Sequence, residues 1–438
     1  MGVNDVASKL RDAADRVLKP PEEVTKLAIK RLSLRSLFLY LGPSLIVSMA
    51  YMDPGNYGTD ILGGQFFAYD LVWAVWLANL MAMILQYLSG KLGIATGRAL
   101  PELVRSSLKS RRLTLPYWLG AEVAAAATDL AEYLGTVIAL NILFQIPLLY
   151  ASIFGALDVI ILLALTRERF RIVEYFFMLL VSVIGIGFLY QILLIQPSLS
   201  SIAYHSVVPT VSGATLFYIV GIVGATVMPH ALYVHSWLTK NKLATATIDE
   251  KRRHRKLHLR EVVITLTIAS LVNVAILVSA AAVIYPQYHN APDVDVNNYV
   301  LILKPLYGYL AGTAFAITLL ASGLASSTTG TLAGQAIMDG LLGTRVNKYL
   351  RRIVTRVINV FPTTFAILLG VDPFSLLVYS QVTLSLMIPL PMIPLILYTR
   401  NRGLMGEFAN RRITNMFAAL AAIIIIALNV GLLISRFA

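Results

Sequence analysis

The stretch Met52-Asp53-Pro54-Gly55-Asn56 interrupts an otherwise apolar run that extends over residues 37–68. A membrane-spanning helix needs about 20 apolar residues, yet Pro54 removes a backbone donor and Gly55 loosens the chain in the middle of this run. Lipid tolerates a broken helix only where the freed carbonyl groups are buried in protein or line a wet cavity. A carboxylate at this depth is costly, so Asp53 is predicted to belong to a functional site.

A second break occurs at Val227-Met228-Pro229-His230, again inside an apolar run. Two broken spanning helices in separate halves of a chain are the usual pointer to the binding site of a secondary transporter. The sequence therefore predicts helix breaks at Pro54, Gly55 and Pro229, with a binding site between them.

Composition assigns the chain to the membrane proteins. Hydrophobic residues make up 57% of the 438 residues and charged residues 13%, and the mean hydropathy is +0.73, which a soluble domain of this size would not show. The absence of cysteine excludes disulfides and thiolate-bound metal. The net charge of +13 could suggest nucleic acid in a soluble protein. Here the basic residues fall in loops between spans, and no nucleic-acid partner is predicted.

The hydropathy pattern predicts an all-α polytopic protein with 11 transmembrane helices. The predicted spans are 37–68, 70–90, 117–142, 147–165, 172–195, 211–238, 261–285, 307–338, 353–371, 374–399 and 413–435. Nearly all Lys and Arg residues fall in alternate loops, which places the N-terminus in the cytoplasm and the C-terminus outside under the positive-inside rule. The basic stretch Lys251–Lys256 is predicted to be a solvated cytoplasmic loop, and residues 1–36 a cytosolic amphipathic segment on the membrane surface.

Five spans precede the second break, so the second half must enter the membrane from the opposite face. The sequence thus predicts a 5+5 inverted repeat, with the first unit at 37–195, the second at 211–399 and an additional span at 413–435. Each unit opens on a broken helix, spans 1 and 6, and the two breaks are expected to face each other near the midplane.

The residues at the breaks favour a cation. Asp53 and Asn56 offer a carboxylate and an amide, while the second break offers carbonyl groups freed by Pro229 and the thioether of Met228. Asp53 would repel an anionic substrate. Oxygen ligands alone suit Mg²⁺ or Ca²⁺, but a thioether favours softer first-row metals, so the set leans toward Mn²⁺ or Fe²⁺, with Cd²⁺, Co²⁺ or Zn²⁺ as competitors.

Asp53-Pro54-Gly55-Asn56 and Met228-Pro229-His230 resemble the paired signature of the Nramp family, the natural-resistance-associated macrophage proteins. The resemblance extends to Ala127–Glu132, Ser326–Gln335 and Ser380-Gln381-Val382. It implies a leucine-transporter-like fold and proton-coupled transport of divalent metals, with no prosthetic group.

Carried over residue by residue, the resemblance implies metal coordination by Asp53, Asn56, Met228, the carbonyl of Ala225 and, in an occluded state, Gln381. It also implies a proton route from Asp53 through His230 and the acids of the third span. The spacing of Glu122, Asp129 and Glu132 independently puts three acids on one helical face, with Arg352 and Arg356 as candidate counter-charges. The chain departs from the family pattern at Ala231, Leu324 and Met387, which leaves the proposed ligands intact.

Other functions remain open from the sequence. An Nramp-like magnesium transporter would be expected to lack the thioether, and an amino-acid symporter of the same fold would bind a carboxylate, which Asp53 disfavours. A channel or a non-transporting receptor would not need two opposed helix breaks. The predicted setting is the lipid bilayer of a plasma (inner) membrane, crossed several times by a monomer.

Overall fold

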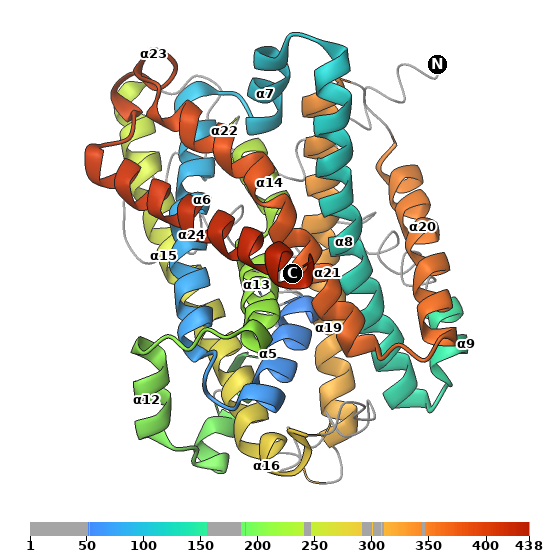
Figure 1. Ribbon diagram of the computed structural model, residues 1–438. Coiled ribbons are helices and arrows are strands. Elements are labelled where there is room, and N and C mark those ends of the chain that lie inside the picture. Colours follow the sequence, from blue (N-terminus) through green and yellow to red (C-terminus); the bar gives the residue numbers. More distant parts are fainter. Residues whose placement is uncertain are drawn as a thin grey trace.

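The structure is a computed structural model that describes residues 51, 53–155, 185–188, 190–240, 247–290, 300, 308, 311–343 and 347–437. Within these ranges the regular structure is helical throughout (Figure 1). The elements are α5 (Pro54–Phe67), α6 (Val72–Thr96), α7 (Leu100–Leu108), α8 (Arg111–Phe144), α9 (Leu148–Phe154), α12 (Leu199–Val207), α13 (Gly213–Val227), α14 (Pro229–Thr239), α15 (Ile248–Val283), α16 (Tyr285–Tyr288), α19 (Ala311–Ile337), a π-helical turn η4 (Met338–Leu342), α20 (Lys348–Leu368), α21 (Pro373–Met387), α22 (Pro389–Arg400), α23 (Arg402–Met405), a 3₁₀ turn η5 (Gly406–Phe408) and α24 (Arg412–Phe437).

Seven helical stretches among the described residues are long and apolar enough to cross a membrane, and they correspond to seven of the predicted spans. They are Val72–Thr96, Arg111–Phe144, Gly213–Thr239, Ile248–Val283, Thr313–Leu342, Pro373–Arg400 and Arg412–Ser435. Shorter apolar helices occur at Gly185–Ile195 and Ile353–Leu368. The multi-pass, all-α architecture is therefore confirmed, while the count of 11 stays a prediction. The predicted segment 1–36 and parts of four predicted spans (chiefly 37–50, 156–165 and 172–184, and also 307 and 309–310) lie outside the described residues.

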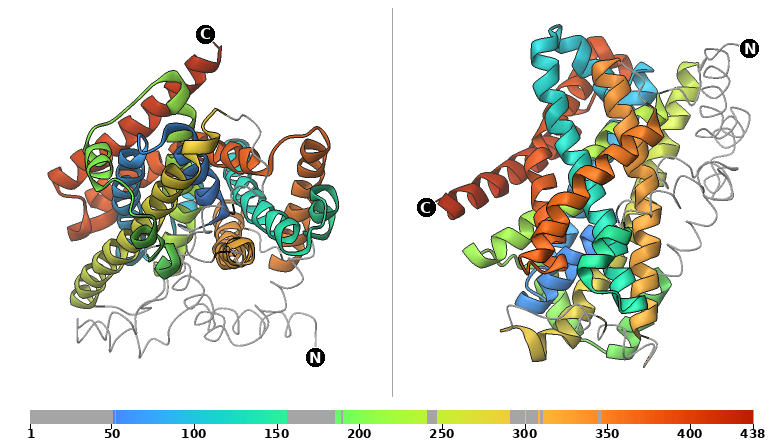
Figure 2. Two further views of the ribbon diagram at one scale, coloured as in Figure 1. Left: turned by 90° about the horizontal axis from the view of Figure 1, so that it is seen from below. Right: turned by 90° about the vertical axis from the view of Figure 1, so that its right-hand side faces the viewer.

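Two groups of helices build the molecule. In one, α15 packs along both α5 and α6, and α13 with α14 lies against α6. In the other, α8 makes its most extensive contact with α19, and α20 and α9 cover the outer side of α8. Helix α21 lies between the groups and contacts α5, α13 and α8. The last helix, α24, projects away from the bundle (Figure 2). The division into two inverted repeats and an additional span stays a prediction.

The prediction of a solvated loop at Lys251–Lys256 was wrong, because these residues form part of α15. Thr247 caps this helix, accepting a hydrogen bond from the Glu250 amide while the Glu250 carboxylate accepts one from the Thr247 amide. This reciprocal pair nucleates a helix start, and Lys and Arg have high helix propensity in water. The helix therefore begins well before the apolar part of the sequence does.

Candidate functional site

The first break is a helix start capped by Asp53. Helix α5 begins at Pro54, where a missing N–H costs nothing, and Asp53 Oδ1 accepts a hydrogen bond from the Asn56 amide at 2.9 Å. Asp53 and Asn56 are 0% and 1% exposed. Among the described residues neither Asp53 Oδ2 nor Asn56 Oδ1 has a hydrogen-bond partner. The cap thus uses one carboxylate oxygen and leaves the other available to a ligand.

The second break is at Met228, which separates α13 from α14. Its φ of 48° and ψ of 97° are outside the helical region, and such a backbone conformation at a non-glycine residue costs about 1–3 kcal/mol, a strain that is typical of functional sites. Pro229 has no N–H, so the Ala225 carbonyl, four residues earlier, lacks its normal intrahelical donor. Helix α13 therefore ends at Val227 and α14 begins at Pro229.

The two breaks meet at Gln381 of α21. A Cβ atom added to Gly55 would lie 2.0 Å from Gln381 Nε2, and one added to Gly224 would lie 1.9 Å from the Gln381 carbonyl oxygen. Gln381 is 0% exposed and its Oε1 has no hydrogen-bond partner in the described part of the chain. One residue therefore lies beside both broken helices, with its side chain against Gly55 and its backbone against Gly224.

The helix directions bring Asp53 to the level of Met228. Gly58 and Gly55 contact Leu377 and Gln381, so α5 and α21 are antiparallel. Gly221 and Gly224 approach Val378 and Gln381 in the same order, so α13 is parallel to α21 and antiparallel to α5. Gly221 also lies against Thr59. Asp53 is six residues before Thr59 on one chain segment, and Val227, the neighbour of Met228, is six residues after Gly221 on the other. Because α5 and α13 are antiparallel, both steps lead in the same direction, so Asp53 and Val227 lie at the same level.

The donors gathered here suit a partly dehydrated cation. They are the oxygens of Asp53, Asn56 and Gln381 that have no partner in the described ranges, the carbonyl of Ala225, and the thioether of Met228, which is 0% exposed. No group of three His, Asp or Glu side chains that could hold a metal occurs within the described ranges. A metal at the breaks would thus depend on one carboxylate, on amide and carbonyl oxygens, and on sulfur.

A row of polar side chains leads from the second break to α8. His230 Nδ1 lies 2.9 Å from Thr128 Oγ1, and His230 Nε2 has no partner in the described structure. One residue along α8, Asp129 accepts a hydrogen bond from Asn359 Nδ2 at 2.8 Å and faces Arg356, whose Nη2 lies 3.6 Å from Asp129 Oδ1. The geometry thus supports Arg356 as the counter-charge of Asp129.

Glu132 and Glu122 lie on either side of this pair along α8. Glu132 is 0% exposed and accepts a hydrogen bond from Ser327 of α19 at 2.8 Å. Glu122, on the N-terminal side of Asp129 in α8, pairs with Arg351 and accepts a hydrogen bond from Trp118. The side chain of Arg352 lies outside the described part of the structure. The structure therefore gives Glu122 a counter-charge, Arg351, that the sequence analysis did not name.

Asp60 is a buried acid that the sequence analysis missed. It lies seven residues after Asp53 on α5, hence on the same helical face, and it is 2% exposed, with no hydrogen-bond partner for Oδ2 among the described residues. Thr226, one residue after Ala225, is likewise buried, and its hydroxyl has no hydrogen-bond partner within the described part of the chain. A second acid within the apolar run 37–68 was the signal that could have identified Asp60.

Replacing Gly224 with alanine is expected to destabilise the fold. The new Cβ would meet the backbone oxygen of Gln381 at 1.9 Å and the backbone nitrogen of Ser385 at 2.8 Å. Overpacking of this kind costs about 1–3 kcal/mol, so Gly224→Ala should lower the thermal unfolding midpoint of the protein in detergent. Gly213→Ala is the matched control, since nothing lies within 4 Å of its added Cβ. Equal midpoints for the two variants would contradict the close approach of α13 and α21.

Fold and site together define a multi-pass membrane protein with two broken helices that meet at a buried cluster of oxygen and sulfur donors. A family model described as natural resistance-associated macrophage protein-like matches residues 44–435. The chain belongs to the Nramp family.

Relatives and solved structures agree with this assignment. The chain is 42% identical to the divalent metal cation transporter MntH of Granulibacter bethesdensis over 402 residues, covering 91% of this chain and 89% of the relative. It is also 42% identical to MntH of Deinococcus radiodurans, covering 90% and 89% of the two chains. The manganese transporter of Eremococcus coleocola superposes with a TM-score of 0.81 at 33% identity, covering 92% and 87%. Mhp1, at 14% identity and a TM-score of 0.59 over 90% and 91% of the two chains, shares the fold.

Proposed function

We propose that the chain is a secondary active transporter that imports Mn²⁺ or Fe²⁺, and also Cd²⁺ or Co²⁺, together with protons. The proposal depends most on one observation: buried oxygens of Asp53, Asn56 and Gln381, which have no hydrogen-bond partner among the described residues, lie where two broken helices meet. The buried Met228 is the residue at which the second helix breaks. Burying such groups without partners is costly, and a dehydrated cation would satisfy them. The relatives described as divalent metal cation transporters support the same class of substrate.

Selectivity follows from the mixture of ligands. Mg²⁺ binds only hard oxygen ligands in near-ideal octahedral geometry and loses its water reluctantly, so a thioether in place of an oxygen disfavours it. Mn²⁺ and Fe²⁺ accept the mixed set, and the softer Cd²⁺ gains most from sulfur. The Ala225 carbonyl and Asn56 oxygen would complete the coordination without adding charge.

Alternating access would expose this site to each face in turn. The group of α5, α6, α13, α14 and α15 would tilt against α8 and α19, with Gln381 of α21 closing on the ion in an occluded state. An inside-negative potential assists import, since moving two charges across it is worth about 4.6 kcal/mol per 100 mV at roughly 2.3 kcal/mol per charge. The C-terminus would lie outside and the N-terminus inside a plasma membrane, and the transporter would work as a monomer.

Protons would use the polar row on α8. A divalent ion beside Asp53 favours the ionised carboxylate, so metal binding would release or accompany a proton at that residue. His230 and Thr128 connect the break to α8, where Asp129 faces Arg356 and Glu132 accepts from Ser327. These groups are held by specific partners, which suits a route through which protons are handed on.

The function is tested by flux into sealed vesicles. Purified protein in proteoliposomes should take up Mn²⁺ along an inside-negative potential and acidify the lumen, as reported by a trapped fluorescent metal indicator and a trapped pH dye. Mg²⁺ and Ca²⁺ should give little signal. Uptake of Mg²⁺ in preference to Mn²⁺ would favour the magnesium transporter, and no saturable flux of any divalent ion would overturn the proposal.

Neutralising Asp129 is expected to separate the metal flux from the proton flux. In Asp129→Asn the hydrogen bond from Asn359 can be replaced by an amide contact, but the charge opposite Arg356 is lost. Metal uptake should persist while acidification of the lumen falls by about 10-fold, within the range by which a positioned proton donor contributes. Dual-dye recordings from the same vesicles measure this ratio. An unchanged ratio of protons to metal would remove Asp129 from the proton route.

A further inference from the structure

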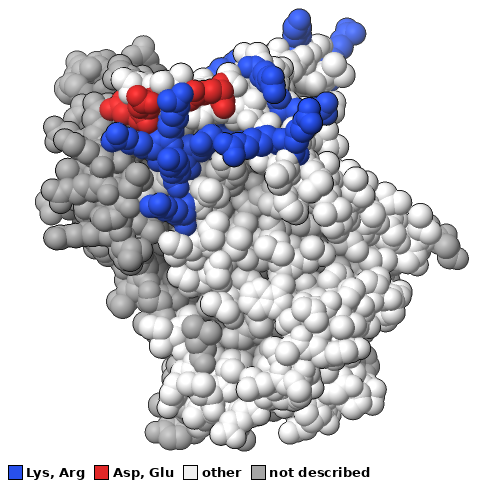
Figure 3. Space-filling model, turned by 90° about the vertical axis from the view of Figure 1, so that its left-hand side faces the viewer, with Lys and Arg blue, Asp and Glu red and all other residues white. Residues whose placement is uncertain are grey.

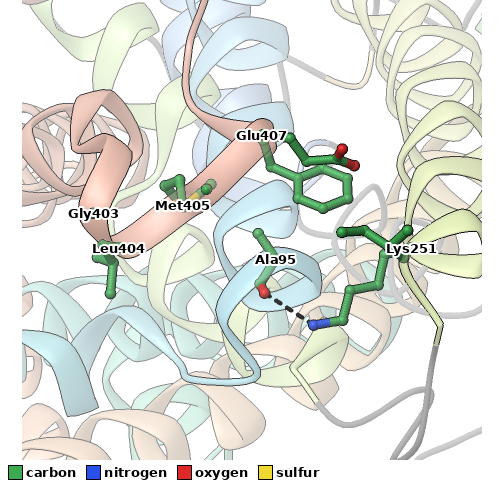
Figure 4. A pocket seen from close by; sticks show the side chains of 9 residues that line it. Ala95, Lys251, Gly403, Leu404, Met405 and Glu407 are labelled. Atoms are coloured by element: carbon green, nitrogen blue, oxygen red, sulfur yellow. Dashed lines mark hydrogen bonds between the residues drawn. The ribbon is translucent and has the colours of Figure 1, made fainter.

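A pocket of about 410 Å³ lies at the end of the molecule where basic side chains gather. It is formed by the last turn of α6, the first turn of α15 and the α23–η5 segment (Figure 4). Its volume falls within the range of small-molecule sites in proteins. The pocket is remote from the helix breaks, and the proposed transport cycle does not use it.

Lys251 gives this pocket a positive charge. Its side chain reaches from α15 toward α6, where Nζ donates to the Ala95 carbonyl at 3.1 Å (Figure 4). An ammonium group has three donors, so two remain for a ligand. Lys251 forms no ion pair with any acid in the described structure. Its charge is therefore available to an anion.

The acid that lines the pocket is already neutralised. Glu407 accepts two hydrogen bonds from Arg252, at 2.8 Å from Nε and 2.5 Å from Nη2. The bonds from Arg252 lower the pKa of the Glu407 carboxyl, which keeps it ionised and paired. A bidentate Arg–carboxylate pair of this kind has a specific geometry. Arg252 also pairs with Asp249 at 2.9 Å, so one guanidinium binds two carboxylates. Both acids are thus bonded to Arg252 and neither forms an ion pair with Lys251 among the described residues.

Further cations surround the pocket. Arg255 lies over the Phe408 ring, 5.6 Å from its centroid. Behind it, Lys91 hydrogen-bonds to Asn410 and lies over the Tyr87 ring at 5.4 Å. Figure 3 shows Lys and Arg side chains in a continuous row across this end of the molecule, with acidic side chains at one part of the row only. The local field favours an anionic ligand.

The apolar residues that line the pocket favour a lipid over a soluble anion. Leu404, Met405 and Phe408 line it. After Ile248 at the first position of α15, the exposed large apolar side chains begin at Leu259 on α15 and at Ile413 on α24, 43% and 66% exposed. Lys251 precedes Leu259 by two helical turns, about 12 Å at 1.5 Å per residue. The pocket therefore lies at headgroup level, just outside the predicted hydrocarbon boundary.

We propose that this pocket binds the phosphate-bearing headgroup of an anionic phospholipid, of the phosphatidylglycerol class. Lys251 contacts the phosphate, and Leu404, Met405 and Phe408 contact the glycerol and the first acyl carbons. Basic pockets between transmembrane helices at the cytoplasmic side are suited to anionic headgroups. The bound lipid would join the ends of α6 and α15 to the α22–α24 connection.

Native mass spectrometry tests the site. The full-length protein is exchanged into detergent containing equal amounts of phosphatidylglycerol and phosphatidylcholine, and retained lipids are counted. Wild type should retain one phosphatidylglycerol in preference, and Lys251→Gln should weaken this retention about fivefold, the effect of about one basic residue near a membrane surface. Arg112→Gln removes the same charge from an exposed position outside the pocket, and should retain the lipid.

Two further experiments, a pocket-filling variant and a competition with a soluble phosphate ester, distinguish a lipid site from the alternatives. Ala95→Leu fills the pocket without changing its charge, and should also lose the phosphatidylglycerol, so it decides the question if Lys251→Gln proves unstable. Equal retention by Lys251→Gln, Ala95→Leu and Arg112→Gln would overturn the proposal. Full displacement of the lipid by soluble glycerol 3-phosphate would also overturn it, because the pocket would then be a site for a free phosphate ester.

Discussion

Asp53→Ala should abolish metal uptake. The change removes the only carboxylate among the proposed ligands, and a dication at the breaks would then face only neutral donors. Loss of a partner in the outer shell of a metal site already costs about 10–100-fold in affinity or activity, so removal of a charged ligand should leave Mn²⁺ flux at the level of protein-free vesicles. Isothermal titration with Mn²⁺ would report the matching loss of binding.

Asp53→Asn separates the ligand role from the capping role. Asp53 also caps α5 through Oδ1, and alanine at a helix cap costs about 0.5–2 kcal/mol, so the alanine variant alone could fail through instability. Asparagine caps as well as aspartate and retains an oxygen, but it lacks the charge. The expected result is a normal unfolding midpoint with lost Mn²⁺ uptake. Wild-type uptake by Asp53→Asn would reduce Asp53 to a structural cap.

The helix breaks were predictable because their causes are local and covalent. Pro54 and Pro229 lack a backbone donor wherever the chain goes, which weakens the hydrogen-bond ladder of an apolar run at those points. Proline alone does not decide a break, since Pro362 and Pro394 lie inside α20 and α22, and it is the neighbouring Asp53, Gly55 and His230 that distinguish the two breaks. The Ala225 carbonyl follows from the same fact, since it is four residues before Pro229. The sequence could therefore locate both breaks before any packing was known.

Contacts between helices that are far apart in the chain could not be predicted as well from the sequence. The position of Gln381 beside Gly55 and Gly224 depends on the register of three helices, and no local pattern encodes register. The same holds for the partners of the α8 acids: Arg356 could be suggested by its charge, but Asn359 and Ser327 are neutral and common. Adjacent helical residues point about 100° apart, so deciding between Arg351 and Arg352 as the partner of Glu122 required the packing itself.

Met228→Ala is expected to change selectivity more than rate. The carboxylate and the amide and carbonyl oxygens would remain, so Mn²⁺ uptake should continue. Without sulfur, a water molecule could take the vacated position and the set would become all-oxygen, which suits Ca²⁺ and Mg²⁺. Cd²⁺ should lose most, because it depends most on the soft ligand. Flux of the four ions into proteoliposomes measures these changes.

The strained backbone at Met228 must be considered in choosing a control for Met228→Ala. Its φ of 48° is strained for any residue with a side chain, so alanine and methionine bear a similar backbone cost, and Met228→Ala changes mainly the ligand and the volume. Met392 is also fully buried but belongs to α22, which contains neither break. Met392→Ala therefore provides the matched loss of a methionine side chain. Altered selectivity in Met228→Ala alone would assign the effect to the sulfur at the break. If both variants retain the wild-type order of ions, the thioether is packing material, and selectivity must reside in the oxygens and in the shape of the closed site.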